Sequence, residues 1–445
     1  MLSVLKNRTY RRLFFAQIVA LSGTGLATVA LGLLAFQLAE DSAALVLGTA
    51  LTIKMVAYVT VAPLAAAFSE RLDRRAMLVA LDLVRAAVGL ALPFVSEVWQ
   101  IYVLIFILQS ASAGFTPAFQ ATIPDVLPDE REYTKALSLS RLAVDMESLL
   151  SPILAAALLT FMSYDNLFWG TVLGFIASAV LVASVLLPSP KPSKPRGIYD
   201  RTTRGMRLYL RSPRLRGLLA VNWVISATGA MVIVNTVVIV RSDLGLSESA
   251  VALVLAAFGA GSMMMAMTIP SLLDHHSARA VMLSGAILNI LALALLALSV
   301  VAIPISMSTI MVGWFTIGAG YSAMLTPGGR VLTRSAHPED RPSVFAAQFA
   351  LSHACWLVFY PVSGWLITEF GTLVTMLVLA VLACLGLITA WCIWPIDADL
   401  PVKHEHPDLP PDHPHLKGAG PHKHVIIVDS LHRQLTRSVR ASDRL

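Results

Sequence analysis

The sequence contains twelve stretches of about 20 or more mostly apolar residues, and this feature decides which fold the chain can adopt. An α-helix rises 1.5 Å per residue, so about 20 apolar residues cross the roughly 30 Å hydrocarbon core of a bilayer. Only 13% of the 445 residues are charged, about half the share of an average soluble domain. The chain is therefore predicted to be an all-α integral membrane protein. Its transmembrane helices are expected at residues 13–39, 43–68, 76–95, 98–120, 134–161, 165–187, 217–240, 247–270, 278–301, 305–327, 342–368 and 372–394.

The basic residues fall in alternate loops between these helices. Four precede the first span, three follow the second, and nine lie between Lys191 and Arg216, whereas the intervening short loops hold mainly Asp and Glu. This bias is the positive-inside rule, and it predicts that both termini and the long middle loop of this multi-pass membrane protein lie in the cytoplasm. Because the basic residues set topology, the net charge of +6 gives no reason to expect nucleic acid as a partner.

Two landmarks recur along the chain and divide it into related halves. Glu70 and Arg75 follow the second span. Their counterparts 204 residues later, after the eighth span, are Asp274 and Arg279, and the run PDER from Pro128 recurs as PEDR 210 residues later. A duplicated six-helix unit places a substrate site near the midplane between the halves, where rocking exposes it to each side in turn. The expected parts are an N-terminal six-helix bundle at 1–187, a basic cytoplasmic linker at 188–216, a C-terminal six-helix bundle at 217–395 and a disordered His-rich cytoplasmic tail at 396–445.

Several segments resemble the major facilitator superfamily of transporters. SERLDRR, from Ser69, resembles the superfamily's acidic-Arg, Arg-Arg loop between helices 2 and 3, with Ala66 where that motif usually has Gly. SPILAA, from Ser151, resembles a relaxed form of the Gly-Pro signature of its antiporters. The resemblance covers residues 1–395 and implies the major facilitator fold. A closer resemblance, to the nickel-resistance branch of bacterial drug-efflux-like facilitators, lies in the His-rich tail and in RRLFFAQIVALSGTGLATVALGLLAFQLA, FQATIPDVLPDE and ALSLSRLAVDMESLLSP.

Charged residues around the SERLDRR loop and its repeat are expected to form a cytoplasmic gate. Asp82 and Arg85 are three residues apart in the third span, so they can also neutralise each other on one helix face, and a purely structural pair is the alternative. The expected gate residues are Glu70, Arg71, Arg74, Arg75, Asp82, Arg85, Asp274 and Arg279.

Few ionisable residues lie inside the expected spans, and each needs a reason because a charge at the helix centre costs roughly 2.5–3.5 kcal/mol on insertion scales. Arg141 and Asp145 can pair at a spacing of four residues. Glu147 lies about 200° around the helix from Asp145, so it does not share Arg141 easily. It is therefore a candidate for binding and releasing protons during transport. The alternative is a structural ion pair with Lys54.

His353 in the eleventh span is expected at the depth of Lys54 in the second, and these two helices are neighbours in the superfamily fold. Imidazole can carry a proton or bind a metal ion, and the alternative is a buried histidine satisfied by a hydroxyl or carbonyl group. Cys355 is two residues further on and points away, so the two cannot chelate one ion on a regular helix. The predicted transport and proton-coupling residues are Glu147, Asp145, Arg141, Lys54 and His353.

The polar tail carries three His-x-His pairs, each starting nine residues after the last. Imidazole suits nickel, cobalt, zinc and copper, and a flexible chain can bring several pairs around one ion. The tail is therefore predicted to collect cytoplasmic metal, and a merely solvated tail is the alternative. The expected metal ligands are His404, His406, His413, His415, His422 and His424.

These features together predict a secondary transporter rather than an enzyme, with no cofactor. The main interpretation is a proton antiporter that exports a divalent metal ion, nickel or cobalt. The alternative is proton-coupled efflux of drugs or other small organic molecules, and a sensor or scaffold that transports nothing is a third class. The sequence has no Gly-rich ATP-binding loop ending in Lys-Ser/Thr, so a proton gradient is the expected energy source. The expected partners are the transported species, protons and lipid, and the protein is expected to be a monomer.

Overall fold

The computed structural model describes residues 2–39, 43–69, 72–188, 197–302, 306–396, 402–404, 422–424 and 427. Five residues with predicted roles lie outside these ranges. They are Glu70 and Arg71 of the expected gate and His406, His413 and His415 of the tail.

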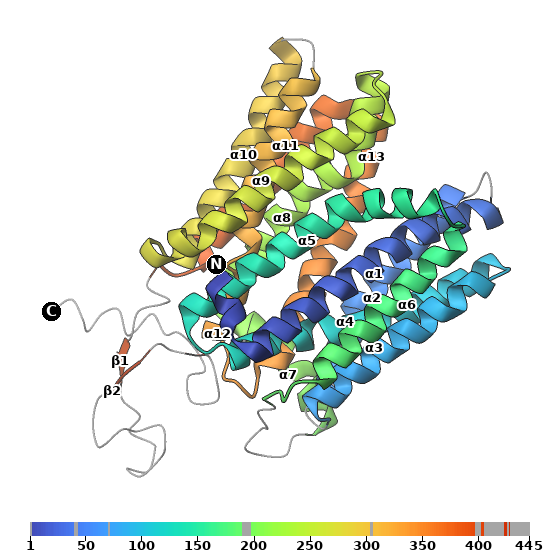
Figure 1. Cartoon of the computed structure of the whole chain (residues 1–445). Helices are drawn as coiled ribbons and strands as arrows, with labels where there is room; N and C mark the ends of the chain where they lie inside the picture. Colours follow the sequence, from blue (N-terminus) through green and yellow to red (C-terminus); the bar gives the residue numbers. More distant parts are fainter. Residues whose placement is uncertain are drawn as a thin grey trace.

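The described chain forms two helical bundles, which diverge from a common end (Figure 1). The N-terminal bundle, here the N-half, contains η1 (Leu2–Lys6), α1 (Arg8–Ala39), α2 (Ala43–Ser69), α3 (Arg74–Ala91), η3 (Leu92–Phe94), α4 (Val98–Val126), α5 (Glu130–Leu159), η4 (Tyr164–Asn166) and α6 (Leu167–Ala183). The C-terminal bundle, here the C-half, contains α8 (Pro213–Val238), the π-helical turn η5 (Ile239–Asp243), α9 (Glu248–His275), α10 (Ala278–Ala302), α11 (Met307–Leu325), α12 (Gly328–Arg334) and α13 (Arg341–Ile393).

The helices account for the twelve expected spans. Within the described residues, nine helices are long and apolar enough to cross a membrane, and α5, bent by 45°, makes a tenth. The 53 residues of α13 would extend about 80 Å if straight, far more than one bilayer, and Gly371 divides them with a φ of 73°. If α13 is counted as two spans and α11, with 19 residues, as a further span, the described helices give the twelve spans that the sequence predicts.

Side-chain caps fix where several of these helices begin. The Asp73 carboxylate accepts a hydrogen bond from the backbone N–H of Ala76 at the start of α3, and Asp129 does the same for Glu132 at the start of α5. Caps of this kind satisfy N–H groups that have no partner inside the helix and contribute about 1 kcal/mol each. The short polar loops therefore fix where α3 and α5 begin, and the first residues of these helices take part in the gate described below.

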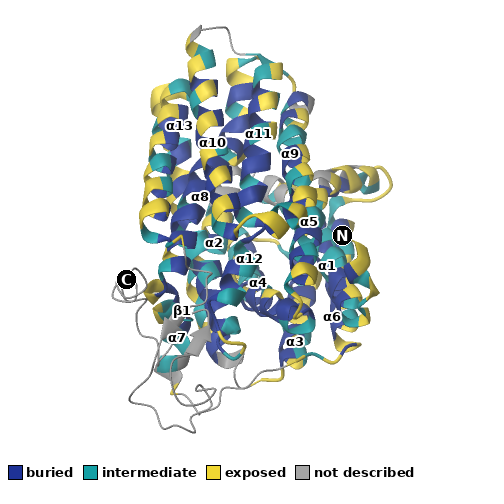
Figure 2. Cartoon of the chain, turned by 90° about the vertical axis from the view of Figure 1, so that its left-hand side faces the viewer, coloured by how far each residue is buried: buried dark blue, intermediate teal, exposed yellow. Residues whose placement is uncertain are grey.

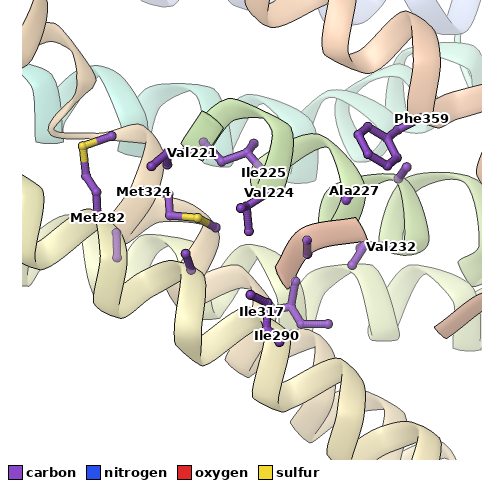
Figure 3. Packing of buried hydrophobic residues seen from close by; sticks show 14 of the residues in the cluster. Val221, Val224, Ile225, Ala227, Val232, Met282, Ile290, Ile317, Met324 and Phe359 are labelled. Carbon is purple, nitrogen blue, oxygen red and sulfur yellow. The ribbon is translucent and has the colours of Figure 1, made fainter. Parts of the chain in front are cut away.

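Apolar side chains cover the outside of both bundles, as expected for surfaces that face lipid. Leu173 on α6, Leu295 on α10 and Val381 on α13 are exposed, and Figure 2 shows exposed positions along the outer helix surfaces and buried ones between helices. Inside the C-half, Val224 of α8 and Ile317 of α11 belong to one continuous apolar core (Figure 3).

The backbones of α9 and α11 approach each other closely at two glycines, Gly261 and Gly318. A Cβ on Gly318 would collide with the carbonyl oxygen of Phe258, and a Cβ on Gly261 would collide with that of Phe315. Small residues let membrane helices approach closely, so packing of the two backbones stabilises this pair.

Replacing Gly318 by Ala is expected to destabilise the C-half. The added methyl group meets backbone rather than a movable side chain, so overpacking should cost about 1–3 kcal/mol. Gly364→Ala is the matched control, because its Cβ would lie 3.7 Å from Val234, an ordinary contact. Thermal unfolding in detergent measures the midpoint temperature of both variants, and the midpoint of Gly318→Ala should be the lower one. Equal midpoints for the two would contradict the packing argument.

The linker between the halves contains a helix, α7 (Ile198–Arg211). Arg204 donates to Asp340 at 2.7 Å, and this hydrogen bond raises the pKa of Arg204 above its ordinary value. Tyr209 is fully buried and donates a hydrogen bond to Gln348 on α13. The linker is therefore bound to the C-half.

Two short strands lie in the tail, where the sequence predicted disorder. β1 (Val402–His404) pairs antiparallel with β2 (His422–His424), and the register sets His404 opposite His422.

Candidate transport site and gate

Charged residues join the two halves at one end of the molecule, which we call the closed end. There α4 ends, α5 begins, and α12 and the start of α13 lie beside them, whereas the far ends of α1 and α10 lie well apart (Figure 1). Asp125, at the end of α4, is the central carboxylate. It accepts hydrogen bonds from Arg74 of the same half at 2.7 Å and from Arg341 of the C-half at 2.5 Å.

A second carboxylate, Glu130 at the start of α5, binds across the halves. It pairs with Arg330 and with Arg334 of α12, the latter at 2.6 Å. Arg131 also reaches Asp274 of α9 at 3.2 Å, but both side chains are exposed and such pairs contribute little. Asp125 and Arg341 are largely buried, so their ion pair is the stronger link.

The structure distributes the predicted gate residues among different environments. Arg74 and Asp274 join the closed-end contacts, whereas Arg279 donates to the carbonyl oxygen of Trp394 within the C-half. Asp82 and Arg85 pair inside the N-half, with the Arg85 guanidinium over aromatic rings of α4 and α6. This is the structural pairing that their spacing allowed, and their part in gating stays a prediction.

Glu147 lies at mid-membrane depth. It is 17 residues from the start of α5, which is about 26 Å along the helix. Ser151, one turn on, donates to its Oε1 at 3.3 Å. The opposing helix α1 presents Gly25 here, and a Cβ at that position would lie 2.6 Å from the same oxygen. The glycine therefore gives the carboxylate its space.

Lys54, Tyr58 and His353 form a second group at a similar depth, where α2 of the N-half meets α13 of the C-half. The Lys54 ammonium lies 5.6 Å from the centre of the Tyr58 ring. That ring contacts Phe349 at 4.8 Å and His353 at 4.7 Å between ring centres. These contacts cross from one half to the other, so movement of the halves must change them.

Lys54 is within electrostatic range of both Glu147 and His353. Among the described residues, no carboxylate forms a salt bridge with its ammonium group, so the alternative of a close ion pair with Glu147 is not formed in this conformation. His353 Nδ1 lies 2.7 Å from the carbonyl oxygen of Phe349. A carbonyl only accepts, so Nδ1 carries the hydrogen and Nε2 of the neutral ring is left as an acceptor.

Arg141 and Asp145 pair on α5 as their spacing predicted, and they also reach the C-half. Ser262 of α9 donates to Asp145 Oδ2 at 2.6 Å, and the Arg141 guanidinium lies 5.1 Å from the ring centre of Tyr321 on α11. Tyr321 in turn packs against Phe258, with ring centres 5.4 Å apart.

Reasoning from the sequence missed several of these residues. Glu130 and Arg341 lie in the repeated PDER and PEDR runs, so the repeat itself was the available signal for the gate. Ser262, Tyr321 and Tyr58 are uncharged or aromatic residues within apolar helices, and nothing in their local sequence separates them from packing residues.

The described part of the chain contains no group of three or more His, Cys, Asp and Glu side chains placed to hold a metal ion. The membrane site instead combines a carboxylate, an ammonium group and an imidazole with aromatic rings. Such a set can bind an organic molecule and exchange protons. Two six-helix bundles that meet at the Tyr58, Phe349 and His353 rings, with Glu147 buried in one of them, have the architecture of a membrane transporter.

Comparison with known proteins agrees with this architecture. The Major Facilitator Superfamily model matches residues 13–235 and 218–439, one match for each half, so the chain belongs to that superfamily. The human organic anion transporter MFSD10 has the same fold, with a TM-score of 0.71, 13% identity, and coverage of 86% of this chain and 99% of the other. A bacterial homologue of the iron transporter ferroportin, in its outward-facing state, gives a TM-score of 0.70, 13% identity, and coverage of 86% and 98%.

Sequence relatives include drug exporters. Macrolide efflux protein A of Streptococcus pyogenes is 29% identical over 159 residues, which cover 34% of this chain and only 39% of that protein. The protein of the same name from Enterococcus faecalis is 28% identical over 152 residues, covering 32% and 47%. The uncharacterized MFS-type transporter YvqJ of Bacillus subtilis is 23% identical over 380 residues, covering 82% and 87%. The chain thus spans less than half the length of the two macrolide efflux proteins that it matches.

Proposed function

We propose that this protein exports amphipathic organic molecules from the cytoplasm, driven by proton antiport. The observation that carries the proposal is the site at mid-membrane depth. The Glu147 carboxylate packs against Gly25 of α1, and the rings of Tyr58 and Phe349 lie at the contact between the halves. Aromatic rings bind apolar surface and a carboxylate binds a basic group, a pairing that suits macrolides. The partial similarity to two macrolide efflux proteins supports this substrate class.

The basic loops indicate which end of the protein faces the cytoplasm. They occur at the closed end, and the positive-inside rule assigns that end to the cytoplasm. The described conformation is then closed to the cytoplasm and open to the outside. In this account it is the state in which substrate leaves and a proton enters.

Proton exchange at Glu147 couples the export of substrate to the entry of protons. When ionised, the carboxylate attracts both Lys54 and a basic substrate. When protonated, it loses that attraction and the substrate is released outside. The halves then rock, the proton leaves to the cytoplasm, and the site is ready for the next molecule.

The direct test is expression in a bacterial host that lacks its own drug exporters. Cells that make the protein should tolerate more macrolide than cells with empty vector, and a protonophore should abolish the accumulation difference. Nickel and cobalt are tested in parallel. Unchanged macrolide tolerance with raised nickel tolerance would reject organic efflux in favour of metal export.

A metal-collecting role of the tail is a second proposal, supported by one observation. The β1–β2 register brings His404 opposite His422, so one histidine of the first His-x-His pair lies beside one histidine of the third. Imidazole binds nickel, cobalt and zinc.

Replacing the six histidines of the three His-x-His pairs by Ala is expected to abolish nickel binding by the purified full-length protein and to leave macrolide export unchanged. Isothermal titration with nickel measures the first and drug accumulation the second. Lys403→Ala with Lys423→Ala, within the same strands, is the control and should bind nickel as the wild type does. Equal nickel binding by the six-Ala variant would place the metal elsewhere.

A further inference from the structure

The hydrogen bond between Ser262 and Asp145 joins the halves deep in the membrane. Ser262 of α9 is fully buried, and Asp145 of α5 is 2% exposed. Asp145 lies 15 residues from the start of α5 and Ser262 lies 13 residues from the end of α9, so each is about 20 Å along its helix from the closed end. The bond is therefore far from the ion pairs at the closed end.

Arg141 extends this contact to a third helix. Its Nε donates to Asp145 Oδ2 at 3.0 Å and lies 3.2 Å from the Ser262 hydroxyl oxygen. The opposite side of the contact is the Tyr321 ring of α11. Two side chains of the N-half thus meet two side chains of the C-half, and we refer to Arg141, Asp145, Ser262 and Tyr321 as the deep cluster.

The members of the deep cluster differ in what they lose when the halves separate. Arg141 and Asp145 lie on one helix, so their ion pair persists in any arrangement of the two bundles. The bonds to Ser262 and the ring of Tyr321 exist only while α5 contacts α9 and α11. An interaction made in one conformation alone shifts the equilibrium between conformations by its own free energy.

The charge of Asp145 and the burial of both residues make the hydrogen bond from Ser262 stronger than one between two neutral groups in water. A hydroxyl that donates to a carboxylate forms a charge-assisted hydrogen bond, about twice as strong as a neutral one. Burial removes the screening by salt and water that weakens exposed ion pairs such as Arg131 with Asp274.

We infer that Ser262 is a positioning residue of the transport cycle, which with Tyr321 holds the Arg141–Asp145 pair across the halves and stabilises the state closed at the α4–α5 end. Opening of that end requires the Ser262 hydroxyl to leave Asp145. The inference concerns the movement of the halves and does not depend on the transported substrate.

The test measures the distance across the closed end without substrate. Spin labels on cysteines at Glu132 of α5 and His275 of α9, both exposed, report it by double electron–electron resonance in a background with Cys355, Cys384 and Cys392 replaced. The unsubstituted background should give mainly the short distance. Ser262→Ala should raise the ratio of long to short distances about tenfold, as expected for losing one hydrogen bond to a charged group.

Two further variants complete the test. Ser271→Ala, on an exposed side of α9, is the matched control and should leave the distances unchanged. Tyr321→Leu removes the ring from Arg141 and should shift the distances in the same direction as Ser262→Ala. A distribution for Ser262→Ala identical to that of Ser271→Ala would overturn the inference, whatever the protein transports.

Discussion

Replacing Glu147 by Gln is expected to lower proton-driven efflux by about two orders of magnitude, the low end of what a positioned proton-transfer group contributes. Gln keeps the shape of the side chain and can still accept the hydrogen bond from Ser151. It cannot be ionised, so it neither binds a proton nor attracts a basic substrate. Folding should be preserved, because the substitution removes a charge from the membrane rather than stranding one.

Drug accumulation in cells, normalised to the amount of protein in the membrane, measures this effect. Glu132→Gln is the matched control, since Glu132 is exposed on the same helix and should be replaceable without loss of transport. Efflux by Glu147→Gln at the wild-type rate would show that Glu147 is structural and that another group carries the proton.

Asp125→Asn is expected to open the closed end. The substitution takes the shared carboxylate from Arg74 and Arg341, and losing one partner of a buried ion pair costs about 3 kcal/mol, the lower end of the usual range. That cost falls on the closed conformation, because only there does Arg341 of the C-half meet Asp125. The ratio of open to closed molecules should therefore rise by about two orders of magnitude.

The distance between labels at Glu132 and His275 measures this shift as well. Asp165→Asn, at the opposite end of the N-half, is the control and should leave the distance unchanged. A short distance retained by Asp125→Asn would show that the Asp125 carboxylate does not decide closure, and that the remaining contacts between the halves keep this end closed.

The sequence predicted the membrane helices well because span length depends on a local property, the number of consecutive apolar residues. It also predicted the pairs Asp82 with Arg85 and Arg141 with Asp145, since both partners lie on one helix. It also placed the break in α13, because the expected spans end at residue 368 and begin again at residue 372, on either side of Gly371.

The sequence did not predict which residues contact each other between different helices. Asp125 and Ser262 act through partners more than 100 residues away, and only the packing of the two bundles brings those partners close. The repeat that contains Glu130 and Arg341 marked the right segments but gave no pairing. The His-rich tail directed the sequence interpretation towards nickel, whereas the proposal of organic efflux rests on the residues within the membrane and on the partial similarity to macrolide efflux proteins.

Uptake of a labelled macrolide into proteoliposomes that contain only this protein tests the central claim most directly. With the cytoplasmic end facing outwards and the lumen made more acidic, wild-type protein should concentrate the macrolide inside, and a protonophore should stop the uptake. Glu147→Gln liposomes should show only passive entry. Macrolide entry by the wild type that is equal with and without the proton gradient, or equal to that of protein-free liposomes, would contradict proton-driven export of organic molecules.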